Sequence, residues 1–334
     1  MGQMTLIAKY CRALKHVTLA VLLFVSTALF FLFLLGAMHF PYDVDVSLNQ
    51  EEVEAARKYY AEAYQRPVSE PQGRSEYETE YVRVAEAAAK KYRIEEQVTA
   101  FVQRFNLNSR PVLEIGSGRG YLQDMAQDYT GLDISPAVSR FYHKKFVLGS
   151  ATAMPFADDS FDGVWSIWVF EHVPNPELAF HEARRVIRDN GVFFLYPAWN
   201  CTSWAAEGYE VRPYSDFGPV GKLIKASVPL RSSWLFRTIS LMPIRIVRRF
   251  VAGLGPTKLR YRRLTPNYER YWVADSDAVN SIDRHEAMLW FVSRGDECLN
   301  CDDGSVFVDY QPLIIRVHKQ GSPPASMNRA IDTR

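Results

Sequence analysis

The sequence predicts an α/β protein built on a doubly wound, mostly parallel, seven-stranded sheet, with an N-terminal transmembrane helix and a basic helical insertion. Three observations predict this class. Short apolar runs alternate with helical patterns over residues 112–197, which is typical of a parallel sheet covered by helices on both faces. A glycine-rich turn follows the first apolar run, and an uncharged apolar segment occupies residues 17–38.

The bulk composition sets only broad limits. Of the 334 residues, 48% are hydrophobic and 23% charged, which is ordinary for a globular chain with a buried core. The formal net charge of +1 neither favours nor excludes a nucleic-acid partner, so charge has to be judged locally.

Residues 17–38 contain no charged side chain and are rich in Leu, Phe and Val. A helix of roughly 20 apolar residues crosses the ~30 Å hydrocarbon core of a bilayer. A secretory signal has a shorter apolar region of ~7–15 residues before a cleavage site. We therefore expect a single-pass, uncleaved membrane anchor, preceded by a basic flank at residues 1–16.

The segment after the anchor predicts helices and one linker. Residues 39–76 are expected to be polar, with a helix at 50–64 and a linker at 66–74, where Pro67, Pro71 and Gly73 interrupt regular structure. Residues 77–105 carry apolar side chains at helical spacing and predict one long helix. This helix opens the main domain, residues 77–320, and a disordered tail is expected at residues 321–334.

The alternating pattern predicts the individual elements of the sheet. Strands are expected at residues 112–115, 130–134, 145–148, 161–166, 191–197, 297–299 and 312–319. Helices are expected at residues 119–127, after Pro136, at 176–189, and from a cap at 275–277 to about residue 294. The core of the domain is residues 110–200, and residues 200–300 form a variable region that would select the substrate.

The turn after the first strand has the sequence PVLEIGSGRGY, residues 111–121. A dinucleotide-binding turn is spaced G-x-G-x-x-G, whereas Gly116, Gly118 and Gly120 alternate, and Tyr121 occupies the place of the third glycine. Glu114 directly before the turn would repel a pyrophosphate and would suit a cationic group such as an ammonium. The turn thus indicates a ligand without phosphate.

Asp133 ends the second predicted strand, 19 positions after Glu114. An acidic residue at this place in a doubly wound sheet accepts hydrogen bonds from ribose hydroxyls. Together, the two carboxylates predict a ligand that contains an adenosyl group and an amino-acid group.

Four blocks in this order resemble the class I S-adenosylmethionine-dependent methyltransferases, in particular the small-molecule group called type 11. They are VLEIGSGRG (112–120), GLDIS (131–135), GSATAMPFADDSFDGVWS (149–166) and EHVPNPELAFHEARRVIRDNGVFFL (171–195). The resemblance is close over about a quarter of the chain. It implies a Rossmann-like methyltransferase fold, methyl transfer as the activity and S-adenosyl-L-methionine as the cofactor.

The resemblance also implies which residues bind that cofactor. The residues expected at its methionine, ribose, adenine and methyl-donor ends are Glu114, Gly116, Ser117, Gly118, Gly120, Asp133, Ile134, Ser150, Ala151, Ser166 and Trp168. Ser150 stands where many relatives have an aspartate. Serine can accept a hydrogen bond from the adenine amine without the assistance of a charge.

The acceptor is expected to be a small or lipid-linked molecule, and its side of the site is less well defined. His172 follows the fourth strand and has an ordinary pKa suited to a general base, although it could equally pack or cap the loop before Pro174. Tyr196, Trp199 and Asn200 are candidates for an acceptor wall.

Residues 221–263 contain eleven Lys or Arg and no Asp or Glu, with apolar residues interleaved at helical spacing. Two short helices separated by Pro243 are expected, with Arg245, Arg248 and Arg249 largely away from the apolar face. Such a segment suits an anionic membrane surface, or it is a lid whose charges are solvated. Nucleic-acid binding is a lesser option because no recognised module accompanies it.

Two sequence features give opposite predictions for the side of the membrane on which the main domain lies. The basic residues Lys9, Arg12 and Lys15 precede the anchor and acidic residues follow it, a pattern that leaves the bulk of the chain outside the cytosol. S-adenosylmethionine is made in the cytosol, and a basic insertion suits the anionic cytoplasmic leaflet. We therefore expect the catalytic domain on the cytosolic face.

Two other functions remain open, as does the role of the cysteines. A nicotinamide-dependent oxidoreductase could use a similar sheet, and a non-catalytic membrane-associated scaffold could retain the fold. Cys298 and Cys301 form a single C-x-x-C without a second pair, so a reduced pair is expected and no metal site.

Overall fold

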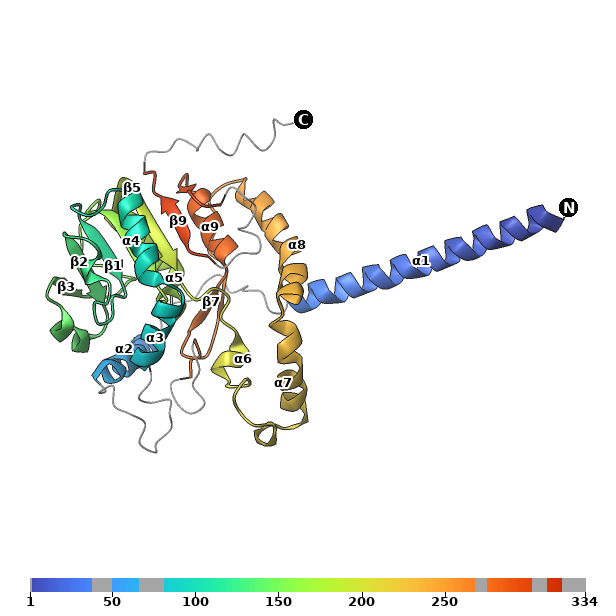
Figure 1. Cartoon of the computed structure of the whole chain (residues 1–334), viewed down its shortest axis with the longest axis horizontal. Helices are drawn as coiled ribbons and strands as arrows, with labels where there is room; N and C mark the ends of the chain where they lie inside the picture. The colour runs from blue at the N-terminus through green and yellow to red at the C-terminus, as the bar shows by residue number, and fades with distance from the viewer. Residues whose placement is uncertain (1, 38–49, 66–80, 268–274, 302–310, 320–334) are drawn as a thin grey trace.

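The computed structural model describes residues 2–37, 50–65, 81–267, 275–301 and 311–319. Within them the main sheet has seven strands in the order β3-β2-β1-β4-β5-β9-β8 (Figure 1). These are β1 Val112–Ile115, β2 Tyr129–Asp133, β3 Lys145–Leu148, β4 Phe161–Ile167, β5 Ile187–Tyr196, β8 Glu297–Cys298 and β9 Leu313–Arg316. The first five are parallel, and β9 runs antiparallel to both β5 and β8. The predicted doubly wound, mostly parallel sheet is confirmed.

Helices cover both faces of the sheet because successive side chains of a strand point to opposite faces. In β1, Leu113 packs in a core with α5 (Pro176–Val186) and α9 (Arg284–Val292). Its neighbour Val112 packs in a second core with α4 (Ile94–Arg104). Both valine and leucine are fully buried, so β1 reads as a continuous apolar run, as expected for a central parallel strand.

The helices before the sheet differ in part from expectation. The helix expected at 50–64 is α2, Gln50–Gln65. The single helix expected over residues 77–105 is wrong: α3 (Tyr81–Lys91) and α4 are separate, and Arg93 between them has a left-handed φ of 53°. A left-handed residue cannot continue an α-helix, so the chain changes direction there. The linker at 66–74 and the tail at 321–334 lie outside the described residues.

The helix expected at residues 119–127 is also wrong. The chain forms only the one-turn 3₁₀ helix η1, Gln123–Met125, and the segment after Pro136 is likewise a 3₁₀ helix, η2, Pro136–Phe141. The crossover from β1 to β2 spans residues 116–128, close to the minimum of about a dozen residues for joining parallel strands. Little chain remains for a helix once the glycine turn has formed.

Two helix boundaries differ from the prediction: one helix ends earlier than expected, and another begins later. The helix expected at 176–189 ends at Val186, because β5 already begins at Ile187 and bends at Asn190, whose φ is 63°. The cap expected at residues 275–277 is instead Asp283, whose carboxylate accepts hydrogen bonds from the backbone of His285 and Glu286. A short strand, β7 (Asn280–Ile282), pairs with β6 (Tyr261–Arg263) before this helix.

The insertion is helical, but its organisation differs from the prediction. It comprises α6 Ser203–Ala206, the 3₁₀ helix η4 Tyr214–Asp216, α7 Pro219–Arg231 and α8 Trp234–Ala252. Pro243 lies inside α8 rather than between two helices. Leu241 and Ile244 beside it are buried, and this packing offsets the backbone hydrogen bond that a proline removes.

Arg245 and Arg248 of α8 are buried, which corrects the expectation that they are solvated or face a membrane. Arg245 bonds the carboxylate of Asp283, and Arg248 donates two hydrogen bonds of 2.7 Å to Glu286. Both acidic partners belong to the start of α9. The arginines therefore fasten the insertion to the domain.

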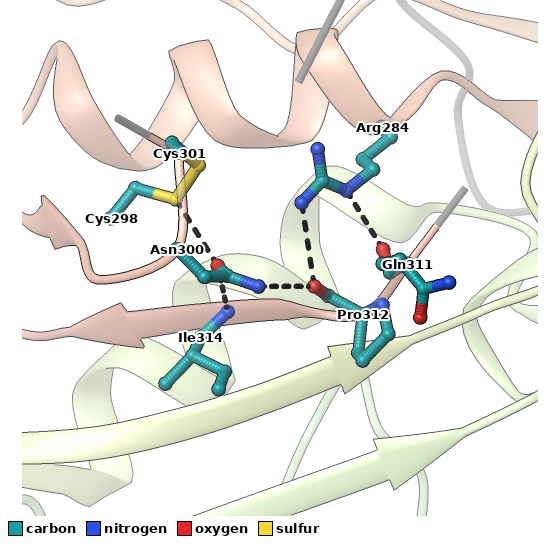
Figure 2. The surroundings of a disulfide bond; sticks show 7 residues. All are labelled: Arg284, Cys298, Asn300, Cys301, Gln311, Pro312 and Ile314. Atoms are coloured by element: carbon teal, nitrogen blue, oxygen red, sulfur yellow. Dashed lines mark hydrogen bonds between the residues drawn. A yellow bond between two sulfur atoms is a disulfide. The ribbon is translucent and has the colours of Figure 1, made fainter. Parts of the chain in front are cut away.

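Cys298 and Cys301 form a disulfide, which corrects the expected reduced pair (Figure 2). The turn after β8 brings their Cα atoms to 5.7 Å, a usual separation for this bond. Between them, the side chain of Asn300 donates to the carbonyl of Pro312 at 2.8 Å and accepts from the N–H of Ile314 at 3.0 Å. The closed turn is thus bonded to the edge of β9.

The apolar N-terminal segment lies in α1, Gly2–Ala37, which projects from the domain (Figure 1). Its residues Leu14–Phe31 have a mean hydropathy of 1.9, and none of them is buried against the rest of the chain. This stretch is long and apolar enough to cross a membrane, although a signal sequence near an N-terminus has the same properties.

Candidate functional site

The glycine turn has the backbone geometry that its sequence requires. Gly116, Gly118 and Gly120 have φ values of 71°, 50° and 72°, a region that other residues rarely adopt. A β-carbon on Gly116 would lie 2.3 Å from the side chain of Val169, and one on Gly118 would lie 3.1 Å from the hydroxyl of Tyr64. Other parts of the chain therefore approach this turn closely from two sides.

Asp133 lies at the end of β2, beside the turn, and is buried. Its carboxylate accepts hydrogen bonds from the N–H of Gly118 at 2.8 Å and from the N–H of Ser135 at 2.9 Å. Burial raises its pKa to about 6, against the lowering effect of these bonds. Since a carboxylate has about four acceptor sites, two further donors, such as vicinal hydroxyls, can still be bound.

The side chain of Glu114, in β1, lies just before the same turn. It accepts a bond of 2.5 Å from the hydroxyl of Tyr129, and only 5% of its surface is exposed. Burial raises the pKa of its carboxyl to about 8, while the Tyr129 bond lowers it. A buried carboxyl with a raised pKa ionises when a cationic group is placed beside it.

A cavity of about 250 Å³ lies over the turn and the ends of β1 and β2. Ten of the residues named from the sequence line it: Glu114, Gly116, Ser117, Gly118, Asp133, Ile134, Ser150, Ala151, Trp168 and His172. Residues far apart in the chain are thus brought around one space.

Two predicted site residues lie elsewhere. Ser166 is buried within the sheet, where its hydroxyl donates to the carbonyl of Ile115 at 3.0 Å, so it ties β4 to β1 and does not line the cavity. Gly120 closes the turn against the side chains of Gln123 and Tyr142, outside the cavity wall. Tyr196, Trp199 and Asn200, the candidates for an acceptor wall, are not among the lining residues either.

The cavity is covered by α2 and α3, which lie in segments expected to be helical but not expected to contribute to the site. Tyr60 and Tyr64 of α2 and Tyr81 of α3 line it, and their rings lie 5.7–6.5 Å apart. In Figure 1 these two helices lie together beneath one end of the sheet. The missed signal is the spacing of Val53, Ala56, Tyr60 and Tyr64, which places four cavity-lining residues on one face of a helix that is polar elsewhere.

The cavity lining also includes His172, around which titratable groups cluster. His172 ends the 3₁₀ helix η3, Phe170–His172, and its Nδ1 lies 3.3 Å from the carbonyl of Asp277 and 3.7 Å from the carboxylate of that residue. The hydroxyl of Tyr60 donates to the same carboxylate at 3.1 Å. The cluster joins three segments of the chain, and the segment with Asp277 was predicted only as a helix cap.

The carboxylates of this cluster stabilise the imidazolium that forms when neutral His172 accepts a proton. Burial lowers the pKa of His172, but the carboxylates of Asp277 and Glu171 outweigh it, so the pKa is raised overall. Glu171 is fully buried, and burial raises its pKa to about 7. The side chain of Asn280 donates to the carbonyls of Phe170 and Val173, which holds the turn that carries both groups. Such a cluster can accept and hold a proton near neutral pH.

Trp168 forms another wall of the cavity and has a left-handed φ of 52°. Its N–H donates to the carbonyl of Tyr196 at 2.7 Å, and its ring packs edge-on against Tyr92. A non-glycine residue held in this region is strained, and such strain is concentrated at functional sites. Among the residues described, no three His, Cys, Asp or Glu side chains are grouped to hold a metal ion.

Comparison with known proteins matches this chain to a methyltransferase family and to individual methyltransferases. Residues 113–195 match the protein family described as "Methyltransferase domain". The chain is 28% identical over 130 residues to a malonyl-[acyl-carrier protein] O-methyltransferase of Coxiella burnetii, which covers 35% of this chain and 46% of that protein. It is 33% identical over 120 residues to a 2-methyl-6-phytyl-1,4-hydroquinone methyltransferase of Synechocystis, covering 31% and 37% of the two chains.

A third relative is a probable phthiotriol/phenolphthiotriol dimycocerosates methyltransferase of Mycobacterium ulcerans, 32% identical over 113 residues, with 30% of this chain and 44% of that one covered. The chain thus spans less than half the length of these curated relatives. Among solved structures, YcgJ of Bacillus subtilis is 24% identical and has a TM-score of 0.29, with 31% of this chain and 51% of that one covered.

Proposed function

We propose that this chain, whose residues 113–195 are a class I S-adenosylmethionine-dependent methyltransferase domain, transfers a methyl group from that cofactor to a small or lipid-linked acceptor at a membrane. The observation that carries the proposal is that one cavity is lined by the glycine turn, Glu114, Asp133 and His172. S-adenosyl-L-methionine would supply an activated methyl group on a sulfonium.

The groups on the turn side fit that cofactor. The left-handed φ of Gly116 and Gly118 lets the turn form in the cavity wall, and Asp133 keeps acceptor sites for ribose hydroxyls. The buried carboxyl of Glu114 suits the ammonium of the methionine part. Ser150 would meet the adenine edge, with its hydroxyl already 2.9 Å from that of Thr152.

The chain's own contribution to the reaction would be positioning and proton transfer. Because the donor is already activated, holding the acceptor in line is the main requirement. His172 would take a proton from an oxygen or nitrogen acceptor, with the carboxylate of Asp277 stabilising the imidazolium. Tyr60 and Tyr64 from α2 would exclude water from the cavity.

The acceptor class is supported by the relatives and by the anchor. Two relatives are named for acceptors that carry hydrocarbon chains, a phytyl hydroquinone and the phthiotriol dimycocerosates. The apolar α1 would hold the domain at the surface where such molecules reside. We place the domain on the cytosolic face, where S-adenosylmethionine is made.

Calorimetric titration of the full-length protein in detergent with S-adenosylmethionine tests the cofactor. We expect saturable binding, and an absence of binding at millimolar cofactor would overturn the proposal. Incubation with labelled methyl donor and a membrane extract, followed by identification of the labelled product, tests the acceptor. Binding without transfer to any lipid, quinone or glycan fraction would favour a non-catalytic scaffold.

A further inference from the structure

The helix α8 differs from an ordinary surface helix of a soluble protein, because charged side chains are buried on its inner face. Its inner face carries Arg245 and Arg248, whose side chains are 3% and 9% exposed and are paired with Asp283 and Glu286. A surface helix ordinarily buries its apolar stripe and leaves its charges in water. In α8 the two ion pairs are buried beside apolar residues such as Leu241 and Ile244.

The outer face of α8 is correspondingly apolar. Ile246, Val247 and Phe250 are 57%, 61% and 76% exposed, and Leu254 just beyond the helix is 79% exposed. The spacing of these positions places them along one side of the helix. We call this set the outer face of α8.

The apolar surface continues beyond α8. Leu223 and Leu230 of α7 are 73% and 66% exposed, and Trp234 at the start of α8 is 65% exposed. α7 and α8 are in contact with each other. Contiguous exposed apolar surface of this kind marks a contact with a membrane or another macromolecule.

The neighbour of this surface is α1. The C-terminal part of α1 lies against α8, and from there α1 leaves the domain (Figure 1). The helix that contains the candidate membrane-spanning stretch Leu14–Phe31 therefore contacts the helix that exposes Phe250 and its neighbours. A helix that emerges from a bilayer brings whatever packs beside its end to the headgroup layer.

We propose that the outer face of α8, together with the exposed leucines of α7, lies in the interfacial layer of the lipid bilayer that α1 spans. This inference rests on the membrane attachment in the proposed function and is independent of methyl transfer. Apolar side chains of an interfacial helix enter the headgroup and acyl boundary, where tryptophan is also favoured. The exposed Arg249, next to Phe250 in α8, suits anionic headgroups.

The role assigned to the insertion thereby changes. A basic amphipathic helix would be held mainly by charge, whereas this face would be held by apolar side chains and would tolerate high salt. With α1 as the first attachment and α8 as the second, the domain would have one fixed orientation on the membrane surface.

Depth measurement with spin labels tests the proposal on the full-length chain in liposomes that contain phosphatidylcholine and phosphatidylglycerol. A label is attached to Phe250→Cys or, as a second position, to Leu254→Cys, each in a Cys11→Ser background. Labels at Phe24→Cys in α1 and Lys145→Cys in β3 are the reference positions for lipid and water. We expect labels at positions 250 and 254 to collide more with oxygen than with a water-soluble nickel complex, as at position 24, and the reverse at 145.

Two outcomes overturn the inference alone. If position 24 is in lipid while positions 250 and 254 are as accessible to nickel as 145, the outer face is in water. If labels at 250 show dipolar coupling to one another at low protein density, a second copy of the chain covers the face. If position 24 itself is in water, the membrane attachment fails as well. Cofactor binding is tested independently of these results, because titration of each labelled variant with S-adenosylmethionine measures it separately.

Discussion

At the scale of single residues, the site depends on two buried carboxyl groups beside a turn that only glycine can form. Glu114 and Asp133 have pKa values raised by burial to about 8 and about 6. Gly116 must keep both its left-handed φ and its lack of a side chain, since Val169 lies directly above it. These features give three predictions about substitutions.

Replacement of Glu114 by Gln is expected to weaken binding of S-adenosylmethionine and to flatten its pH dependence. In the wild type, a cationic ligand favours the carboxylate, so binding releases a proton and strengthens as the pH rises towards about 8. Calorimetry in buffers of different ionisation enthalpy between pH 6 and 9 measures both effects. An equal proton release by the Gln variant would exclude Glu114 as its source.

The same group predicts how the ligand-free protein responds to pH. Its folded pKa of about 8 lies above the ordinary value of 4.5, so folding favours the protonated form. The stability from this group is complete below the ordinary value and is lost as the pH rises through about 8. Glu114→Gln should therefore be more stable than the wild type at pH 9 and similar to it at pH 4.5, as measured by denaturant unfolding.

Replacement of Gly116 by Ala is expected to destabilise the turn for two separable reasons. The left-handed φ costs roughly 1–2 kcal/mol for a non-glycine residue. The added β-carbon would also lie 2.3 Å from Val169. We expect Gly116→Ala to cost less free energy of unfolding in a Val169→Ala background than in the wild type. Equal costs in the two backgrounds would mean that the contact is irrelevant.

Replacement of His172 by Gln tests its role as a base. Loss of a general base typically lowers the rate of the chemical step by about 10²–10⁴-fold. We expect that loss in kcat for labelled methyl transfer, with cofactor affinity unchanged, because the hydrogen bonds that hold Asp133 come from Gly118 and Ser135 and do not involve His172. A variant that keeps full kcat would leave His172 with a packing role only.

At the scale of elements, the insertion is joined to the domain by buried ion pairs between α8 and α9. Arg248 and Glu286 are 9% and 1% exposed, and their two bonds are 2.7 Å long. A buried pair contributes little by itself, but an unpaired charge left behind is costly. The orientation of α8, and with it the direction of its apolar face, therefore depends on these contacts.

Replacement of Arg248 by Ala is expected to lower the free energy of unfolding by about 3–5 kcal/mol, because Glu286 would remain buried without its partner. Arg57→Ala is the matched control. Its pair with Glu54 is exposed, and the expected change is below about 0.5 kcal/mol. Denaturant unfolding of both variants measures the difference. Similar small losses for the two would show that the inner pair is not needed to hold α8.

At the scale of the whole molecule, the proposed membrane attachment raises the question of which side carries the domain. The flanking charges and the Cys298–Cys301 disulfide are features of proteins outside the cytosol, whereas the cofactor is made inside it. The buried arginines of α8 no longer add to the cytosolic side of this balance.

Thiol trapping in intact cells, combined with protease protection of sealed vesicles, tests the cytosolic placement. We expect Cys298 and Cys301 to react as thiols in cells, because the cytosol keeps such pairs reduced, and to oxidise to the disulfide after lysis. An oxidised pair in intact cells would place the domain on the other face.

Local sequence determined much of the fold and identified many of the residues that line the cavity. Strand positions followed from apolar runs, and the turn and Asp133 followed from spacing, because these features depend on neighbours in the chain. Helix ends were less well determined: Arg93, Val186 and Asp283 mark boundaries that depend on what packs nearby.

Only the tertiary structure decided which residues meet from distant segments. The cover of Tyr60 and Tyr64 over the turn, and the contact of His172 with Asp277, join segments more than 50 residues apart. The tertiary structure also decided which face of α8 is buried. The sequence alone determined an amphipathic helix, but pairing with the acidic residues at the start of α9 buries its arginines. The physical reason is that periodicity defines the faces of a helix, whereas the partners available in three dimensions determine which face is buried.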